Sequence, residues 1–170
     1  MIRLANTNDL NASLSLIKAC IIDMKEKGVE QWPDFYPNIE ILQNDISKGN
    51  LFVAELKNEI IGIVALSPSF PKQYEAIPWK YKSKMANSIH RFAVSPKKKD
   101  PNLAKKLIYF VEDLSRKQGY DVIRLDTYSK NTIANKFYSK MGYKYAGDIN
   151  QDHMPELYNC FEKRISLSSG

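Results

Sequence analysis

The hydrophobic positions predict an alternation of helices and strands along the whole chain. In some segments apolar residues recur at spacings of three and four, and in others they form short, nearly continuous runs. The helical spacing predicts helices over residues 9–27, 38–47, 103–119 and 131–141. The short runs predict strands over residues 2–4, 51–56, 60–66, 89–94, 122–127, 143–147 and 156–163.

The order of these elements predicts a mixed α/β sheet with helices on its faces. A chain of 170 residues can bury the core of one domain and is short for two. We therefore expect a single domain over residues 1–165, followed by a frayed tail at 166–170.

Turn-forming residues separate the predicted elements. A hairpin is expected at Lys57-Asn58-Glu59, between the second and third strands. Residues 31–37 hold two prolines among aromatic residues and predict an irregular loop. Residues 67–84 hold three prolines and predict a long, partly ordered loop, a kind of segment that is often functional.

Composition narrows the class of protein. Hydrophobic residues make up 44% and charged residues 26%, which is typical of a globular domain. No apolar run approaches the length that spans a bilayer, and the first residues lack the apolar core of a signal peptide. We expect a cytoplasmic protein without a membrane partner.

The net charge of +6 indicates an anionic partner, with nucleic acid, a membrane surface and a phosphate-bearing cofactor as the alternatives. Lysines cluster at 97–99 and 105–106, where a predicted strand gives way to a helix. A lysine run is usually a solvated surface. At the start of a helix, however, unpaired backbone N–H groups also favour phosphate binding.

The cysteines and histidines do not form a metal-binding pattern. Cys20 and Cys160 lie far apart, and neither His90 nor His153 has a cysteine at ligand spacing. We predict two buried thiols and no metal site.

The helix expected at 131–141 is the most informative segment. Its pattern N-x-x-A-x-x-F-Y-x-x-x-G-Y has Asn131 as a cap and Gly142 as a stop. Its helically spaced apolar residues should bury one side, and these are Ile133, Ala134, Phe137 and Met141. Tyr138 follows that stripe by one position, where its phenol either reaches a cleft or is a half-buried packing contact.

This pattern resembles the last helix of the GCN5-related N-acetyltransferase (GNAT) family, and the resemblance extends from about Ile2 to Arg164. It implies a mostly antiparallel mixed sheet, split between the fourth and fifth strands, with helices on both faces. It implies acetyl-coenzyme A (acetyl-CoA) as cosubstrate. It also implies that Tyr138 is the general acid that protonates the departing thiolate.

The resemblance implies a cofactor site in two segments. The strand 89–94 would contact the pantetheine arm, with the Val94 N–H stabilising the oxyanion. The following loop resembles the pyrophosphate motif Q/R-x-x-G-x-G/A, with Lys99 at the first position and Asn102 and Ala104 at the glycines. Asn102 is expected to tolerate a positive φ there. The implied cofactor-binding residues are Phe92, Ala93, Val94, Lys99, Asp100, Asn102, Leu103, Ala104, Lys105 and Asn131.

The acceptor is expected to be a primary amine, on a small molecule or a peptide. Because such an amine has a pKa of about 10.4, some group must take its proton before attack. His90 suits this role, or packs in the sheet, so the catalytic set is Tyr138, His90 and Val94. Glu55 is a second candidate, or a solvated carboxylate. Four aromatic residues either wall an acceptor pocket or simply pack, and these are Trp32, Tyr36, Tyr74 and Trp79.

The favoured function is an N-acetyltransferase in which the amine attacks the thioester directly. Two rivals stay open. A non-catalytic acyl-CoA sensor is suggested by Asn102 and by Pro101, which lacks an N–H donor. A nucleic-acid-binding domain is suggested by the charge alone, and no recognition motif supports it. No nucleic acid partner is therefore expected, and a homodimer stays open.

Overall fold

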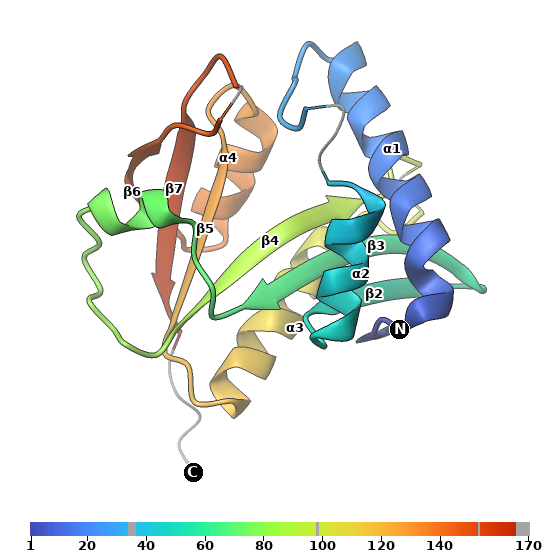
Figure 1. Cartoon of the computed structure of the whole chain (residues 1–170), viewed down its shortest axis with the longest axis horizontal. Helices are drawn as coiled ribbons and strands as arrows, with labels where there is room; N and C mark the ends of the chain where they lie inside the picture. Colours follow the sequence, from blue (N-terminus) through green and yellow to red (C-terminus); the bar gives the residue numbers. More distant parts are fainter. Residues whose placement is uncertain (34–36, 98, 153, 166–170) are drawn as a thin grey trace. The chain divides into compact units, whose positions relative to one another are not determined.

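The computed structural model describes residues 1–33, 37–97, 99–152 and 154–165 (Figure 1). The chain divides into two compact units, Met1–Leu66 with His90–Val111, and Ser67–Ile89 with Glu112–Gly170. The predicted tail at 166–170 lies outside the described residues. The single domain expected over residues 1–165 stays a prediction.

The described strands form one sheet in the order β1-β2-β3-β4-β5-β7-β6. The β4–β5 pair is parallel, and its recorded pairs join Ala86–Ser88 to Val122–Arg124 at the start of both strands. The pairs β1–β2, β2–β3, β5–β7 and β6–β7 are antiparallel, so the predicted mixed, mostly antiparallel sheet is confirmed. The bounds are β1 Ile2–Leu4, β2 Leu51–Leu56, β3 Glu59–Ser67, β4 Ala86–Val94, β5 Val122–Tyr128, β6 Lys144–Ile149 and β7 Tyr158–Arg164.

The predicted helices are confirmed with small shifts at their ends. They are α1 Leu10–Glu26, α2 Ile39–Ser47, α3 Leu103–Lys117 and α4 Thr132–Lys140. Two short 3-10 helices accompany them, η1 Thr7–Asp9 and η2 Lys72–Ala76.

Two boundary predictions were wrong. The hairpin turn is Lys57-Asn58 alone, with φ of 50° and 64°, because Glu59 already pairs with Leu56. Two successive residues with positive φ are typical of the tight two-residue turn that joins twisted antiparallel strands. β4 begins at Ala86, three positions before the predicted Ile89, because Ala86-Asn87-Ser88 pairs with β5 despite its polar residues.

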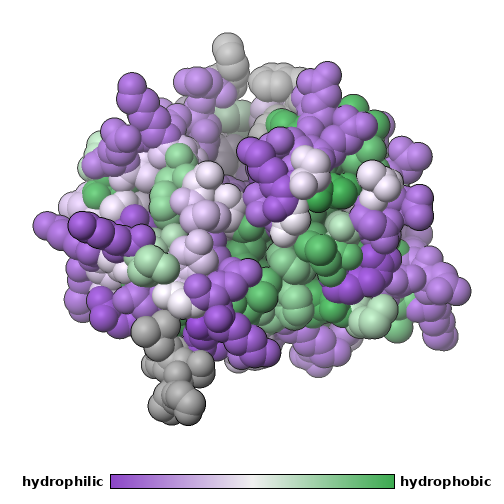
Figure 2. All heavy atoms as spheres, turned by 60° about the horizontal axis from the view of Figure 1, so that its bottom comes forward, coloured by the Kyte–Doolittle hydropathy of each residue, from purple (hydrophilic) through white to green (hydrophobic). Residues whose placement is uncertain are grey.

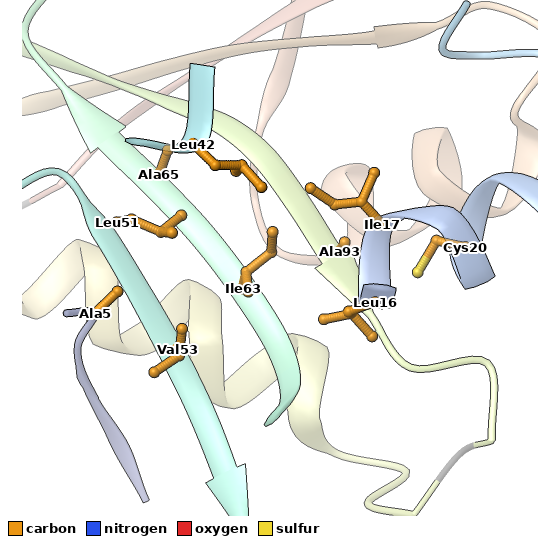
Figure 3. Packing of buried hydrophobic residues seen from close by; sticks show 10 residues of the cluster. All are labelled: Ala5, Leu16, Ile17, Cys20, Leu42, Leu51, Val53, Ile63, Ala65 and Ala93. Carbon is orange, nitrogen blue, oxygen red and sulfur yellow. The ribbon is translucent and has the colours of Figure 1, made fainter. Parts of the chain in front are cut away.

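In the first unit, helices cover both faces of the sheet. The core lies between α1 and α2 and the inward residues of β2, β3 and β4 (Figure 3). It comprises Ala5, Leu16, Ile17, Cys20, Leu42, Leu51, Val53, Ile63, Ala65 and Ala93. On the opposite face, Phe52 packs edge-on against Phe110 of α3, with the two ring centres 5.2 Å apart. A Cβ at Gly62 would lie 3.0 Å from side chains of Leu103 and Leu107, so α3 needs a glycine there to approach β3.

In the second unit, the segment predicted as a partly ordered loop is anchored at several points. The Glu162 carboxylate of β7 accepts the backbone N–H groups of Lys80 and Tyr81 at 2.9 and 2.8 Å. The Arg124 guanidinium of β5 lies 4.6 Å from the centre of the Trp79 ring. Because Arg124 and Glu162 are directly opposite each other in the β5–β7 pair, they share a face of the sheet, and the segment covers that face.

The surface in Figure 2 is hydrophilic over much of the visible face, with hydrophobic residues mainly right of the centre and in a smaller group on the left. Among the residues that the structure describes, no helix is long and apolar enough to cross a bilayer.

Candidate active site

The end of β4 carries a backbone irregularity. Arg91 has a φ of 47°, the left-handed region that non-glycine residues seldom occupy inside a strand. It immediately precedes Phe92, Ala93 and Val94, the residues that were expected to contact the pantetheine arm. The irregularity therefore sets the direction of this segment as it leaves the regular part of the strand.

Arg91 is held by a buried ion pair. Its guanidinium donates two hydrogen bonds to the Asp45 carboxylate of α2, one of them from Nη2 to Oδ1 at 2.7 Å. The side chains of Arg91 and Asp45 are only 13% and 5% exposed. Beyond Arg91, the Val94 carbonyl accepts a hydrogen bond from the Cys20 thiol at 3.3 Å. The Ser95 N–H donates a hydrogen bond to the Ile61 carbonyl at 2.8 Å.

The loop after β4 leads into a helix start with unused donors. Asp100 Oδ1 accepts the Asn102 N–H at 2.9 Å, and the Asp100 carbonyl accepts the Leu103 N–H at 3.2 Å. Within the described part of the chain, no acceptor is recorded for the N–H groups of Ala104 and Lys105. These are the groups that a helix start presents to an anion.

Asn102 differs from its expected role. It is not among the described non-glycine residues with a positive φ. The loop reaches the helix through the Asp100 turn, in which a side-chain oxygen mimics a backbone acceptor, so no left-handed residue is needed.

The lysines of this loop form ion pairs with carboxylates. Lys99 bonds to Glu59 of β3, Lys97 lies 4.0 Å from the same carboxylate, and Lys106 bonds to Asp100 at 2.7 Å. Lys106, then the Asn102 N–H, lower the pKa of Asp100, and Lys99 lowers that of Glu59. Such solvent-exposed pairs are weak, so an anion of higher charge can displace these carboxylates.

α4 is fixed at both ends. The Asn131 side chain accepts the Ala134 N–H at 3.1 Å, which confirms the predicted cap. At the other end Gly142 has a φ of 91°, and the Tyr143 N–H donates to the Tyr138 carbonyl at 3.0 Å. The amide of Asn135 donates to the carbonyls of Tyr128 and Asn131, tying the helix to the end of β5.

Tyr138 is buried, which corrects the predicted burial of this helix. Ile133, expected in the core, is 70% exposed, whereas Tyr138 is 6% exposed. Its ring lies 6.0 Å from that of Tyr143 and 6.1 Å from that of Phe161 of β7. Burial, and secondly the charge of Asp126, raise the pKa of Tyr138 well above its ordinary value. The phenol therefore holds its proton throughout the neutral pH range.

The predicted bases lie in the first unit. His90 is half-buried within β4. Glu55 of β2 is engaged by Arg3, whose Nε lies 3.0 Å from its carboxylate. Arg3 also binds Asp9 at 2.8 Å, so Glu55 belongs to a structural ion-pair group.

The predicted aromatic residues have different surroundings. Trp32 packs partly buried against the first core, and Tyr36 lies outside the described residues. Trp79 donates its ring N–H to the Tyr74 carbonyl at 3.0 Å, and its face covers Arg124. The Tyr74 hydroxyl donates to Asp126 of β5 at 2.5 Å.

Both cysteines are buried and free, as predicted. Burial raises the pKa of Cys20 to about 11 and also raises that of Cys160. The thiolate is the nucleophilic form, so neither residue is suited to form an acyl-enzyme near neutral pH. Among the described residues no group of three His, Cys, Asp or Glu side chains could hold a metal ion.

Comparison with known proteins decides the family. The model of the acetyltransferase (GNAT) family matches residues 16–143 of the 170. The chain belongs to the GNAT family. The matched range contains β4, the basic loop and α4, the elements on which the sequence resemblance depended.

Relatives and solved structures agree with the GNAT assignment. The uncharacterized N-acetyltransferase YesJ of Bacillus subtilis strain 168 is 25% identical over 146 residues, covering 84% of this chain and 78% of YesJ. A structure of an acetyltransferase assigned to Staphylococcus aureus Mu50 is 27% identical with a TM-score of 0.77, covering 98% of this chain and 99% of that one. A GNAT acetyltransferase from Streptococcus agalactiae 2603, 24% identical over 96% of this chain and 94% of its own, shares the fold with a TM-score of 0.83.

As a GNAT protein, this chain is an acetyl-CoA-dependent N-acetyltransferase that acetylates an amine. That assignment favours the enzyme over the non-catalytic sensor. The predicted cofactor segments 92–94 and 99–105 lie in the first unit, while Asn131 and Tyr138 lie in the second.

Sequence reasoning missed two polar groups. One is the pair of Arg91 and Asp45, which are separated by 46 positions. The other is Asp126, which stands in the apolar run of β5. The alternation of Arg124 and Asp126 with apolar residues was a signal that one face of this strand is polar.

Proposed function

We propose that this GNAT enzyme transfers the acetyl group of acetyl-CoA to a primary amine by direct attack, with Tyr138 as the general acid. The observation that carries the proposal is the buried phenol on a helix capped at both ends. A general acid must be protonated when the leaving group departs, and burial secures this for Tyr138.

Direct attack is supported by the state of the two thiols. A covalent acyl-enzyme needs an activated nucleophile, and the pKa values of both Cys20 and Cys160 are raised. The amine nitrogen then bonds to the thioester carbon itself. The carbon–sulfur bond breaks, and the sulfur receives the proton of Tyr138.

The cofactor is proposed to bind along residues 92–94 and 99–105. The unused N–H groups of Ala104 and Lys105 support pyrophosphate binding at the start of α3, where the helix dipole favours negative charge. Lys99 would exchange Glu59 for a phosphate oxygen. The Val94 N–H is proposed to stabilise the oxyanion, and Asn131 to contribute from the start of α4.

The test is Tyr138→Phe, which keeps the ring and removes the phenolic proton. We expect kcat to fall by a factor of about a hundred to ten thousand, the usual contribution of a positioned acid. Cofactor affinity and Tm should change little. The loss should shrink with a thioester whose thiol is more acidic, because that leaving group needs less protonation.

Tyr143→Phe is the matched control. Tyr143 is also buried, and among the described residues its hydroxyl has no hydrogen-bond partner. Its removal should leave kcat unchanged. If Tyr138→Phe behaves like Tyr143→Phe while chemistry limits the rate, Tyr138 is not the acid.

A further inference from the structure

Asp126 is a carboxylate with acceptor capacity to spare. It stands in β5 and is half-buried. Its Oδ2 accepts the Tyr74 hydroxyl at 2.5 Å, and its Oδ1 accepts the Gln151 amide at 3.4 Å. An ionised carboxylate offers about four acceptor positions, so these two neutral donors leave room on both oxygens.

No cation balances Asp126 in the part of the chain that the structure describes. The nearby titratable groups are Tyr74 of η2, Tyr138 of α4 and Cys160 of β7, and all three are neutral near pH 7. Arg124 stands two residues earlier, but its guanidinium donates to the Tyr81 carbonyl at 2.8 Å and lies against Trp79. Even a partly buried charge without a charged partner is costly, so a carboxylate kept in this state suits a ligand that brings positive charge or N–H donors.

The two faces of β5 separate Asp126 from Tyr138. Tyr138 packs on Phe161, which pairs with Leu125 and shares its face of the sheet. Asp126 pairs with Cys160 and points to the other face, beneath Tyr74. A group that donates a proton and a group that accepts one thus lie on opposite faces of the same strand.

We propose that Asp126 binds the protonated amine of the acceptor and takes a proton from it before it attacks. This rests on the proposed function and adds a general base, for which His90 and Glu55 were the candidates from the sequence. One ammonium proton passes to Asp126 and on to solvent, and the neutral nitrogen then bonds to the carbonyl carbon. The carbon–sulfur bond breaks, Tyr138 protonates the sulfur, and the second proton lost by nitrogen restores the phenol through solvent.

The environment of Asp126 suits this role. Burial raises its pKa above the ordinary value, which strengthens it as a base, while hydrogen bonds from Tyr74 and Gln151 partly offset the rise. Activity requires the ionised carboxylate. The acid limb of the kcat/KM profile therefore reports Asp126, and removing the Tyr74 hydroxyl must move that limb to higher pH.

The experiment compares wild type, Asp126→Asn, Tyr74→Phe and Asp148→Asn. Asp148→Asn is the control, because Asp148 is an exposed carboxylate on β6, which β7 separates from β5, and it accepts the Asn159 amide at 2.7 Å. The probes are acetyl-CoA with ethylamine, benzylamine, spermidine or an alanyl dipeptide. We expect Asp126→Asn to lower kcat/KM about a hundredfold or more and to abolish the acid limb, Tyr74→Phe to shift it upward, and the control to match wild type.

A purely structural role for Asp126 predicts a different result. Tyr74→Phe and Asp126→Asn would then lose activity and Tm together, and the acid limb would not move, which overturns the proposal. Catalysis predicts instead that Asp126→Asn keeps or raises Tm at pH 7, since a carboxylate with a raised pKa weakens the folded state when ionised.

Binding separates this inference from the proposed function. If wild type turns over none of these amines, the proposed function fails. The inference is then tested by binding, as the rise in Tm that an amine causes when coenzyme A is also present. It survives if Asp126→Asn abolishes that rise, and it fails if wild type shows no rise.

Discussion

The ion pair of Arg91 and Asp45 should control both stability and the end of β4. The perturbation is Asp45→Ala, which removes the carboxylate that binds this buried guanidinium. Because the two side chains are 13% and 5% exposed, the loss should approach the value for a broken buried pair, about 3–5 kcal/mol of unfolding free energy. The matched control is Asp23→Ala, which removes the exposed Lys27–Asp23 pair and should cost at most about 1 kcal/mol.

Part of the stabilisation from the Arg91–Asp45 pair offsets the cost of the positive φ at Arg91. A non-glycine residue in a sparsely populated backbone region costs about 1–3 kcal/mol. Without Asp45, Arg91 should relax toward the extended region, and the segment Phe92–Val94 should turn with it. We therefore expect kcat/KM to fall beyond what the loss of folded protein explains.

Glycine at position 91 tests this reasoning. It adopts a positive φ without strain, and Arg91→Gly combined with Asp45→Ala removes both buried charges together. The double variant should be more stable than either single variant in urea unfolding, and its acetyl-CoA turnover should exceed that of Asp45→Ala alone. The reasoning is wrong if the stability losses of the two single variants add up to that of the double variant. It is also wrong if Asp45→Ala is as stable as the Asp23→Ala control.

Two further variants test the start of α3. Gly62→Val inserts methyl groups where a Cβ already lies 3.0 Å from Leu103 and Leu107, so calorimetry should show a loss of about 1–3 kcal/mol, together with weaker acetyl-CoA binding. Lys99→Ala removes only a solvent-exposed pair with Glu59, so Tm should hold. Titration calorimetry should then show weaker binding of coenzyme A but unchanged binding of a pantetheine thioester without the nucleotide, and equal losses for both would contradict the phosphate role.

Local patterns predicted the elements because their causes are local. Helical periodicity placed α1 to α4, and Asn131 and Gly142 marked the ends of α4 because capping depends on residues within one turn. β4 was predicted too short because Asn87 and Ser88 are polar. Their partners, Ser115 and the carbonyl of Ser67, lie on separate segments of the chain.

The chemistry of the candidate site depended on distant partners, and a single sequence does not reveal these. Tyr138 is buried by Tyr143 and Phe161, which lie outside α4. The spacing of apolar residues within the helix therefore predicted its buried face about one position away from the observed one. Asp126 meets a hydroxyl 52 positions away. Arg91 takes its unusual conformation beside a carboxylate 46 positions away, and nothing in the letters around it indicates a left-handed residue.

The burial of Tyr138 makes a last prediction about the alkaline side of the pH profile. A tyrosine has an ordinary pKa of about 10, and burial raises that of Tyr138 further, so the phenol keeps its proton at every pH below 10. No alkaline fall in kcat/KM with a midpoint below pH 10 should therefore arise from this residue.

The raised pKa of Tyr138 also limits its strength as an acid. A thiol of pKa about 8.5 lies at least about 1.5 units below the phenol, so complete transfer to the free thiolate costs about 2 kcal/mol or more. Protonation must then accompany the breaking of the carbon–sulfur bond, and the loss in Tyr138→Phe should lie near a hundredfold, the lower end of the range for general acids. An alkaline limb below pH 10 that is present in wild type and Tyr143→Phe but missing in Tyr138→Phe would show that the phenol ionises at its ordinary pKa or below, and the argument from burial would fail.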